Sequence, residues 1–180
     1  MESVLDRVIK QNTENVNLLK TKDYNIFSVL QIQSKEVLIC RMIADLLNPR
    51  GQHGAGAEYL KIFLRDCLGM EKMDTKLADQ AIVTAEYAID DERRIDIVIE
   101  IGSYFLPIEV KIYAADQKSQ CFDYYQYAKR RDAQAKVYYL TLDGHRPGKD
   151  STSSGNRSVT EEDIVCLSFR EHILNWLKAC

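Results

Sequence analysis

Two apolar segments joined by a two-residue turn constrain the fold of this chain more than any other feature. The segments RRIDIVIEI and YFLPIEVKIY are separated only by Gly102 and Ser103. A two-residue connection that begins with glycine is typical of a tight β-hairpin, and runs of Ile and Val this long favour strands. If Ile101 and Tyr104 close the turn, the register of the hairpin is fixed.

That register places two carboxylates on adjacent strands. Asp96 lies directly opposite Glu109 in a non-hydrogen-bonded pair, the closer kind. Pro107 also falls at a non-hydrogen-bonded position, where its missing N–H does not interrupt the ladder. Strand alternation puts both acids on one face with Val98 and Lys111, and it predicts an opposite face formed by Ile95, Ile97, Ile99, Ile108, Val110 and Ile112.

Opposed carboxylates repel each other, and burying them adds a further cost unless a cation lies between them. Hard oxygen ligands with room for water suit Mg²⁺ or Mn²⁺. Lys111 projects from the same face, where an ammonium can activate a nucleophile or offset charge on a phosphate. The alternatives are that one carboxylate is solvated on an exposed sheet face and that Lys111 forms an ordinary cross-strand salt bridge.

The rest of the sequence alternates between helical and strand periodicity. It predicts the order α-α-β-β-β-α-β-β-α, an α/β fold in which a mixed central sheet of about five strands is flanked by helices. The expected helices cover residues 34–49, 57–69, 115–131 and 170–180, the expected strands cover 81–89, 93–101, 104–113, 136–142 and 163–169, and 143–158 is expected to be a mobile loop.

The length of 180 residues predicts a single domain over 1–180, with residues 1–33 as a helical N-terminal arm. The last helix reaches Cys180 without a capping residue, so we expect the native chain to extend further. The net charge of −3 argues against a uniformly basic surface, so any contact with nucleic acid requires a local patch.

Cysteine usage and the N-terminal residues bear on location. The five cysteines form no C-x-x-C pair, which favours free thiols in a reducing compartment. The first residues lack the apolar core of a signal peptide, and no apolar run is long enough to cross a membrane. We therefore expect a cytoplasmic protein without a membrane partner.

Asp96, followed on the next strand by Glu109-Val110-Lys111, resembles the signature of the PD-(D/E)XK nuclease superfamily. Over roughly residues 25–180 the sequence is similar to that of one prokaryotic group within this superfamily. The similar segments are LLNPRGQHG, RRIDIVIE, IEVKIYAADQKSQ, YYLTLDG and WLKAC. One departure is Ile95, which stands where the superfamily's name has proline. The resemblance implies a restriction-endonuclease-like core and hydrolysis of phosphodiester bonds that depends on Mg²⁺, for which Mn²⁺ would substitute. It also implies a nucleic-acid substrate, for which we expect DNA in preference to RNA.

The resemblance also assigns roles to single residues. It implies a cation held by Glu36, Asp96, Glu109 and the Val110 carbonyl, with Lys111 acting on the attacking water. Glu36 shares an apolar helix stripe, although a charge near a helix N-terminus is also favourable without any ligand. Glu86 is a weaker fourth acid, equally compatible with a solvent-facing position on its strand.

Five further polar or aromatic candidates follow the second acid-bearing strand. Gln120 and Tyr124 form Q-x-x-x-Y, which is similar to a motif of recombination-type exonucleases. The resemblance implies that Gln120 supports catalysis and that Tyr124 contacts nucleic acid, although such a stripe is more often a half-buried helix face. The basic run Lys129, Arg130 and Arg131 is a candidate phosphate contact, or a solvated face.

Two functions remain open from the sequence. The complete set of acids, lysine and glutamine favours a metal-dependent nuclease. The acidic balance slightly favours the alternative, a catalytically inactive nuclease-like module that binds nucleic acid or protein, because fold alone does not decide function.

Overall fold

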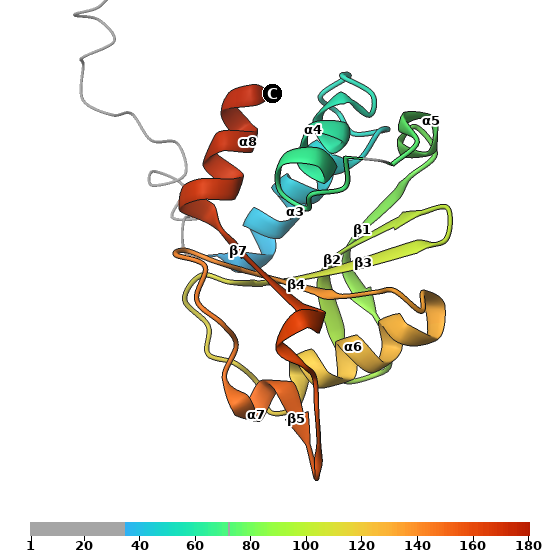
Figure 1. The fold of residues 1–180 in the computed structure, drawn as a ribbon. Helices are drawn as coiled ribbons and strands as arrows, with labels where there is room; N and C mark the ends of the chain where they lie inside the picture. Colours follow the sequence, from blue (N-terminus) through green and yellow to red (C-terminus); the bar gives the residue numbers. More distant parts are fainter. Residues whose placement is uncertain (1–34, 72) are drawn as a thin grey trace, which may run out of the picture. The chain divides into compact units, whose positions relative to one another are not determined.

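A computed structural model describes residues 35–71 and 73–180, whose backbone forms a five-stranded sheet with helices on both faces (Figure 1). The strand order is β1-β2-β3-β4-β7. β1 (Ile82–Ala88), β2 (Arg94–Ile101) and β3 (Tyr104–Lys111) are antiparallel neighbours. β4 (Val137–Thr141) runs parallel to β3, and β7 (Ile164–Ser168) runs parallel to β4. The predicted α/β fold with a mixed five-stranded sheet is confirmed.

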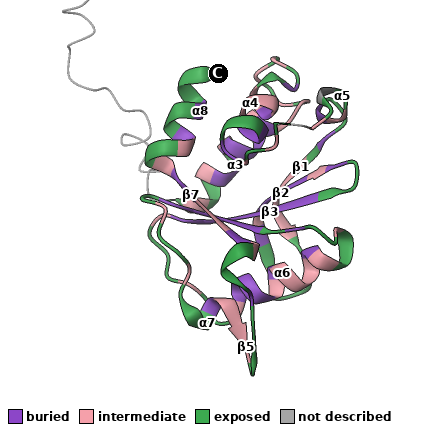
Figure 2. Ribbon diagram, in the orientation of Figure 1, coloured by how far each residue is buried: buried purple, intermediate pink, exposed green. Residues whose placement is uncertain are grey.

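Three helices cover one face of this sheet, namely α3 (Glu36–Leu47), α4 (Glu58–Asp66) and α8 (Leu174–Ala179) (Figure 1). Their buried side chains form the main core with the sheet residues Ile97, Ile99, Ile101, Leu106, Ile108 and Val110 (Figure 2). Trp176 closes this core, since its ring meets Phe63 edge to face and its Nε1 donates to the Tyr59 carbonyl at 2.8 Å.

The opposite face carries α6 (Gln120–Arg131), which follows β3 in the chain (Figure 1). Tyr124 and Ala128 of this helix pack on the sheet residues Ile95, Val98 and Phe105. The sheet is therefore buried on both faces near β2 and β3, which explains why these two strands are so rich in isoleucine and valine.

The register predicted for the β2–β3 hairpin is confirmed from the turn to the middle of the strands. Ile101 pairs with Tyr104, and the pairing continues as far as Ile97 with Ile108. Gly102 has a φ of +57°, which suits the first central residue of a type II′ turn.

The prediction that Ile95 shares a face with Ile97 is wrong. Ile97 packs under α3, whereas Ile95 packs under α6. The partner strand changes face at the same level, because Ala85 packs against the α3 side and Tyr87 against the α6 side. Strand alternation fails here because the residue between them, Glu86, has a left-handed backbone with φ of +53°.

The start of one predicted helix and the predicted loop over 143–158 also differ from the structure. The helix expected from residue 115 begins at Gln120, because Ser119 adopts a left-handed φ of +58°. Ser119 is held there by two hydrogen bonds, from its N–H to the Asp150 carbonyl at 2.7 Å and from its hydroxyl to the Ser153 carbonyl at 2.8 Å. Both carbonyls lie in the segment 143–158, which was predicted to be a mobile loop but contains secondary structure.

That segment contains α7 (Lys149–Thr152) and a small hairpin of β5 (Ser153–Ser154) and β6 (Arg157–Ser158), both packed beside α6. The structure also adds elements that the sequence did not predict, namely α5 (Thr75–Ala78), a 3₁₀ turn (Glu161–Asp163) and a π-helical turn (Phe169–Ile173) before α8. The predicted arm over 1–33 lies outside the described residues. None of the helices in the described part is long and apolar enough to cross a membrane.

Candidate active site

The site forms where β2 and β3 stop pairing. The last paired residues are Ile97 and Ile108, and the next N–H of β3 toward β2, that of Val110, donates to Asp96 Oδ2 at 2.8 Å. The Asp96 carboxylate thus takes the place of a ladder acceptor. Because the N–H and C=O of one residue in an antiparallel strand face the same neighbour, the Val110 carbonyl also faces β2.

The pairing of β2 with β1 is interrupted at the same level. Glu86 lies opposite Asp96, between the paired positions Ala85–Ile97 and Tyr87–Ile95, and has the left-handed backbone described above. Non-glycine residues rarely adopt this conformation, and such strain is often found at functional sites. The Glu86 side chain itself pairs with Arg41 of α3 at 2.6 Å and does not line the acid cleft described below.

Glu109 and Lys111 lie at the end of β3 and are almost inaccessible to water, with exposed fractions of 1% and 9%. Lys111 Nζ lies 2.6 Å from Glu109 Oε1, a buried ion pair. Among the described residues, neither carboxylate oxygen of Glu109 has a partner in hydrogen-bonding geometry. Buried carboxylates are normally well satisfied, whereas Oε1 contacts only the Lys111 ammonium and Oε2 contacts no donor, so this carboxylate can accept a further positively charged or donating group.

Burial and then the adjacent Asp96 carboxylate raise the pKa of Glu109 well above its ordinary value, despite the opposing effect of Lys111. Burial also raises the pKa of Asp96, more than the Val110 N–H and Lys111 lower it. Burial would lower the pKa of Lys111, but the surrounding carboxylates, Glu109 first, raise it. The site therefore contains one positive charge, that of Lys111, and two neighbouring carboxyl groups. When no cation is present, these two groups favour holding one proton between them.

Glu36 reaches the same place from the first turn of α3. Its Oε1 accepts three backbone N–H groups at the end of β3, from Ile112 at 2.6 Å, Tyr113 at 2.7 Å and Ala114 at 3.0 Å. Burial alone would raise the pKa of Glu36, but these bonds and Lys111 lower it. The structure brings Glu36 to the site, as predicted, and uses this oxygen to fix the backbone that follows Lys111.

Gln120 and Tyr124 approach from α6. Gln120 is 5% exposed, and its Nε2 donates to the Tyr124 hydroxyl at 3.0 Å. That hydroxyl donates in turn to the Arg94 carbonyl of β2. Tyr124 is 1% exposed and its hydroxyl is occupied by Gln120 and the Arg94 carbonyl, so its contact with nucleic acid stays a prediction that this buried position does not favour.

A polar cleft brings these groups together. Glu36, Asp96, Glu109, Lys111, Gln120 and Tyr124 all line it, together with Glu92, Arg93, Arg94, Ala114 and Gln117. Arg93 was not predicted from the sequence; it donates to Asp123 Oδ2 within α6 at 3.1 Å and to Gln117 Oε1 in the segment before α6 at 2.9 Å. Its only sequence signal was its position three residues before Asp96.

The sequence as a whole matches a known family. A model of the PD-(D/E)XK nuclease superfamily matches residues 24–180. The chain belongs to this superfamily. No curated protein and no solved structure matches the chain. The five-stranded mixed sheet with flanking helices is consistent with the restriction-endonuclease-like fold of this superfamily.

The basic run predicted to contact nucleic acid lies at the far end of α6, about 15 Å along the helix from Gln120. Arg131 is already engaged, with Glu100 at 3.2 Å and with the hydroxyls of two tyrosines. Lys129 donates to the Ala133 carbonyl at 3.0 Å. Of these three residues, only Arg130, which is exposed and lies over the Tyr127 ring, has no side-chain hydrogen bond or ion pair to another described residue. Contact of this basic run with phosphate stays a prediction, and Arg130 is the residue best placed for it.

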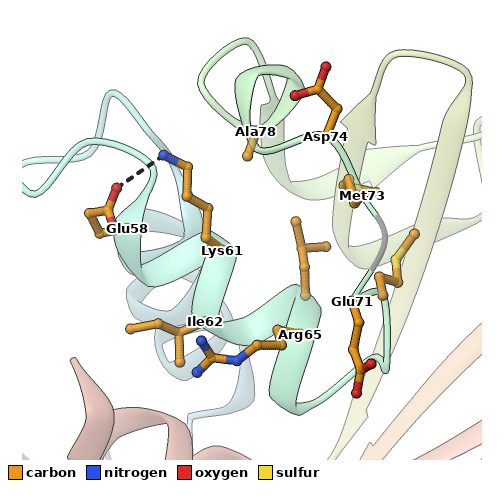
Figure 3. Close-up of a pocket in the computed structure, with 10 residues that line it drawn as sticks. Glu58, Lys61, Ile62, Arg65, Glu71, Met73, Asp74 and Ala78 are labelled. Carbon is orange, nitrogen blue, oxygen red and sulfur yellow. Dashed lines mark hydrogen bonds and ion pairs between the residues drawn. The ribbon is translucent and has the colours of Figure 1, made fainter.

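A second hollow, between α4 and α5, lies away from the superfamily's motif residues (Figure 3). Its lysine and arginine already have acidic partners: Lys61 pairs with Glu58 at 3.0 Å, and Arg65 pairs with Asp66 at 2.5 Å. Its lining includes none of the residues that resemble the superfamily's signature, Asp96, Glu109 and Lys111, which line the cleft at the end of β3.

The donor set of the cleft fits a divalent cation of the Mg²⁺ type. In the described part of the chain, no group of three or more His, Cys, Asp and Glu side chains is arranged as a metal cluster. Mg²⁺ does not need one, because it is commonly bound by one or two carboxylates, waters and substrate phosphates. The Glu109 carboxylate, whose Oε2 has no partner among the described residues, the adjacent Asp96 and the Val110 carbonyl supply such a set, whereas Glu36 Oε1 is already occupied.

Removing one of the two central acid charges should stabilise the metal-free protein. In Asp96→Asn an amide oxygen can still accept the Val110 N–H, while the repulsion of Glu109 is lost. The pKa values of Asp96 and Glu109 are raised in the folded parent, so the folded state binds protons more tightly than the unfolded state. The parent therefore loses stability as pH rises above the ordinary carboxyl range. We expect a higher melting temperature for Asp96→Asn at pH 8 in EDTA, by about 2–4 °C for each kcal/mol gained, and a smaller advantage near pH 5.

Asp91→Asn is the control for that comparison, since it removes an exposed carboxylate from the turn before β2. A melting temperature for Asp96→Asn below that of the parent at pH 8 would show that repulsion between the two acids is not the dominant effect.

Glu36 should act as a brace for the backbone after β3. Glu36→Ala leaves three N–H groups without their acceptor, so its free energy of unfolding should fall by roughly 1–3 kcal/mol. Glu36→Gln keeps one acceptor oxygen and should lose less than half of that. The lowered pKa of Glu36 means that this stabilisation is lost as pH falls through its folded-state pKa, so parent and Glu36→Ala should converge in acid.

Urea denaturation measures both effects. Glu58→Ala is the matched control, because Glu58 is also the first residue of its helix but pairs only with Lys61 at the surface, and it should stay within about 1 kcal/mol of the parent. Equal losses for Glu36→Ala and Glu58→Ala would rule out the brace.

Proposed function

We propose that this chain is a metal-dependent nuclease that hydrolyses phosphodiester bonds, with DNA preferred over RNA. The observation that carries the proposal is the Glu109 carboxylate, buried beside Asp96, with Lys111 as the only partner of Oε1 and, among the described residues, no partner for Oε2. Such a group is costly in a structural role and useful in a metal-binding one. The preference for DNA rests on the likeness of the Gln120–Tyr124 motif to that of recombination-type exonucleases.

Asp96, Glu109 and the Val110 carbonyl would hold Mg²⁺, with Mn²⁺ as a substitute. When bound, the cation would offset the charge of a phosphodiester and lower the pKa of a coordinated water. Glu36 also lines the cleft, but we assign it to the backbone of residues 112–114. If Glu36 also binds the cation, as the resemblance implies, it would do so through its second oxygen, Oε2.

Lys111 would act on the nucleophile and on the phosphate. In the metal-free site its Nζ is held by Glu109 Oε1 at 2.6 Å. Its pKa is raised by the surrounding acids, so it stays protonated at neutral pH and supplies a positive charge rather than a general base. A buried ammonium next to the reacting phosphate would stabilise the negative charge that develops in the transition state.

Gln120 would orient a water or the lysine. Its amide N–H is fixed by the hydrogen bond to the Tyr124 hydroxyl, and its oxygen lies 3.4 Å from the backbone N–H of Gln117. Tyr124 is a positioning residue that acts through Gln120. Arg94 is exposed at the mouth of the cleft, two residues before Asp96, and is the nearest candidate for a contact with an adjacent phosphate.

The second candidate function is a nuclease-like module that binds without cleaving. The observation that favours it is the Lys111–Glu109 ion pair, which in part neutralises the acids without any cation. The two functions differ in their response to metal and in the effects of single substitutions at the cleft.

Divalent metal should stabilise the folded enzyme by mass action. We expect millimolar Mg²⁺ or Mn²⁺ to raise the melting temperature of the parent in differential scanning fluorimetry at matched ionic strength; a site at 100 times its Kd gains about 2.7 kcal/mol. Asp96→Asn should weaken this response, and Glu36→Gln should retain it. A melting curve of the parent that does not move across millimolar Mn²⁺ would favour the non-cleaving module.

Substitutions at the cleft should separate chemistry from metal binding. Lys111→Met keeps the length of the side chain and removes its charge, so cleavage of labelled single- and double-stranded DNA and RNA should fall by at least ~10²-fold while the metal-induced thermal shift remains. Glu109→Ala should lose both cleavage and the metal-induced thermal shift. Gln120→Ala should keep the thermal shift and lose part of the cleavage rate.

Lys178→Met, the same change at an exposed position on α8, is the control and should cleave as well as the parent. Full activity of Lys111→Met beside an inactive Glu109→Ala would reduce the lysine to a structural ion-pair partner.

A further inference from the structure

A shallow, mostly apolar hollow adjoins the acid cleft. Its lining consists of Lys35, Glu36, Val37, Leu38, Tyr113 and Ala114, contributed by the start of α3 and by the backbone after β3. Glu36 and Ala114 line both the hollow and the cleft, so the two are continuous. A polar cleft with buried acids thus opens directly onto an apolar surface.

Tyr113 is the most exposed large apolar side chain in the described part of the chain, at 67%. Val37 and Leu38, in the first turn of α3, are exposed to 42% and 39%. Single exposed apolar side chains need no explanation, but a group of three beside a functional cleft commonly marks a binding surface.

The backbone that carries this ring is rigidly held. The N–H of Tyr113 and those of its two neighbours all donate to one oxygen of Glu36, at 2.6–3.0 Å. Tyr113 also stands only two residues after Lys111. The ring is therefore presented from a fixed backbone at the edge of the reacting centre, which reduces the entropy lost when a ligand binds to it.

We propose that Tyr113, with Val37 and Leu38, forms a stacking platform for an unpaired nucleobase adjacent to the phosphodiester in the cleft. This inference rests on the proposed function, which places a nucleic acid there. A nucleotide joins a charged phosphate to a flat aromatic base; the cleft would hold the phosphate through its proposed cation and Lys111, and the adjoining hollow would hold the base. Bases in a duplex have both faces covered by neighbouring base pairs, so the platform selects a single strand or a frayed end.

Binding should therefore depend on the aromatic ring. We would measure it by fluorescence anisotropy with a short labelled single-stranded oligodeoxynucleotide, with Ca²⁺ in place of Mg²⁺. Stacking on an aromatic side chain predicts that Tyr113→Ala weakens binding by about 5- to 150-fold. Tyr113→Phe keeps the ring and should bind like the parent, and a blunt duplex should show no loss with either variant.

Tyr104→Ala is the matched control. Tyr104 is an exposed tyrosine at the opposite end of β3, about 20 Å from the cleft, and its removal should leave binding unchanged. Thermal melting of both variants checks the fold. A large loss of stability in Tyr113→Ala without a loss of binding would mean that the ring packs against the protein itself, and would overturn the platform.

An abasic position in the oligonucleotide provides the decisive comparison. If one base stacks on Tyr113, removing that base and removing the ring eliminate the same interaction, so one abasic position should weaken the parent but not Tyr113→Ala. Additive losses at every position would overturn the platform, as would a parent that does not bind the single strand.

These results are separable from those for the proposed function. Cleavage that requires Glu109 and Lys111 but is indifferent to Tyr113 would overturn the platform alone. Ring-dependent binding of the single strand without any cleavage in Mg²⁺ or Mn²⁺ would support the platform and overturn the nuclease proposal.

Discussion

The charge balance at the end of β3 is the constraint on which the rest of the site depends. Two carboxylates, Asp96 and Glu109, are held side by side in a largely dry environment against the single ammonium of Lys111. A sheet that paired fully through this level would force the acids into direct repulsion. The structure instead ends the β2–β3 ladder before Asp96 and interrupts the β1–β2 ladder at Asp96, so that its carboxylate can accept a backbone N–H and β2 and β3 can separate.

The hairpin shows what a sequence can specify. Gly102 determined the turn, and the turn determined the register of Ile97 with Ile108. Asp96 and Glu109 were therefore placed together from spacing alone. The departures begin at Glu86, whose left-handed backbone no propensity would predict for a glutamate in a strand. Ile95 changes face for this reason, because period-2 reasoning assumes an unbroken strand.

Tertiary contacts explain the other differences. The helix after β3 starts late because Ser119 is bound by a segment about 30 residues further along the chain. Tyr124 and Glu36 both line the cleft, and each hydrogen-bonds the backbone: Tyr124 a carbonyl of β2, and Glu36 three N–H groups after β3. Motif spacing identifies which side chains converge, and it carries no information on which atom each one touches.

The two-residue turn at Gly102 has a consequence for how related sequences can vary in length. Side chains in a strand alternate faces, so an inserted residue that shifted β3 by one position against β2 would turn one of the two acids away. The turn lies about 16 Å from Asp96 and contacts nothing in the cleft. An insertion there is compatible with the site only where a longer hairpin loop absorbs it, whereas insertions should be tolerated far more readily between Thr141 and Ile164, where the chain already carries extra elements.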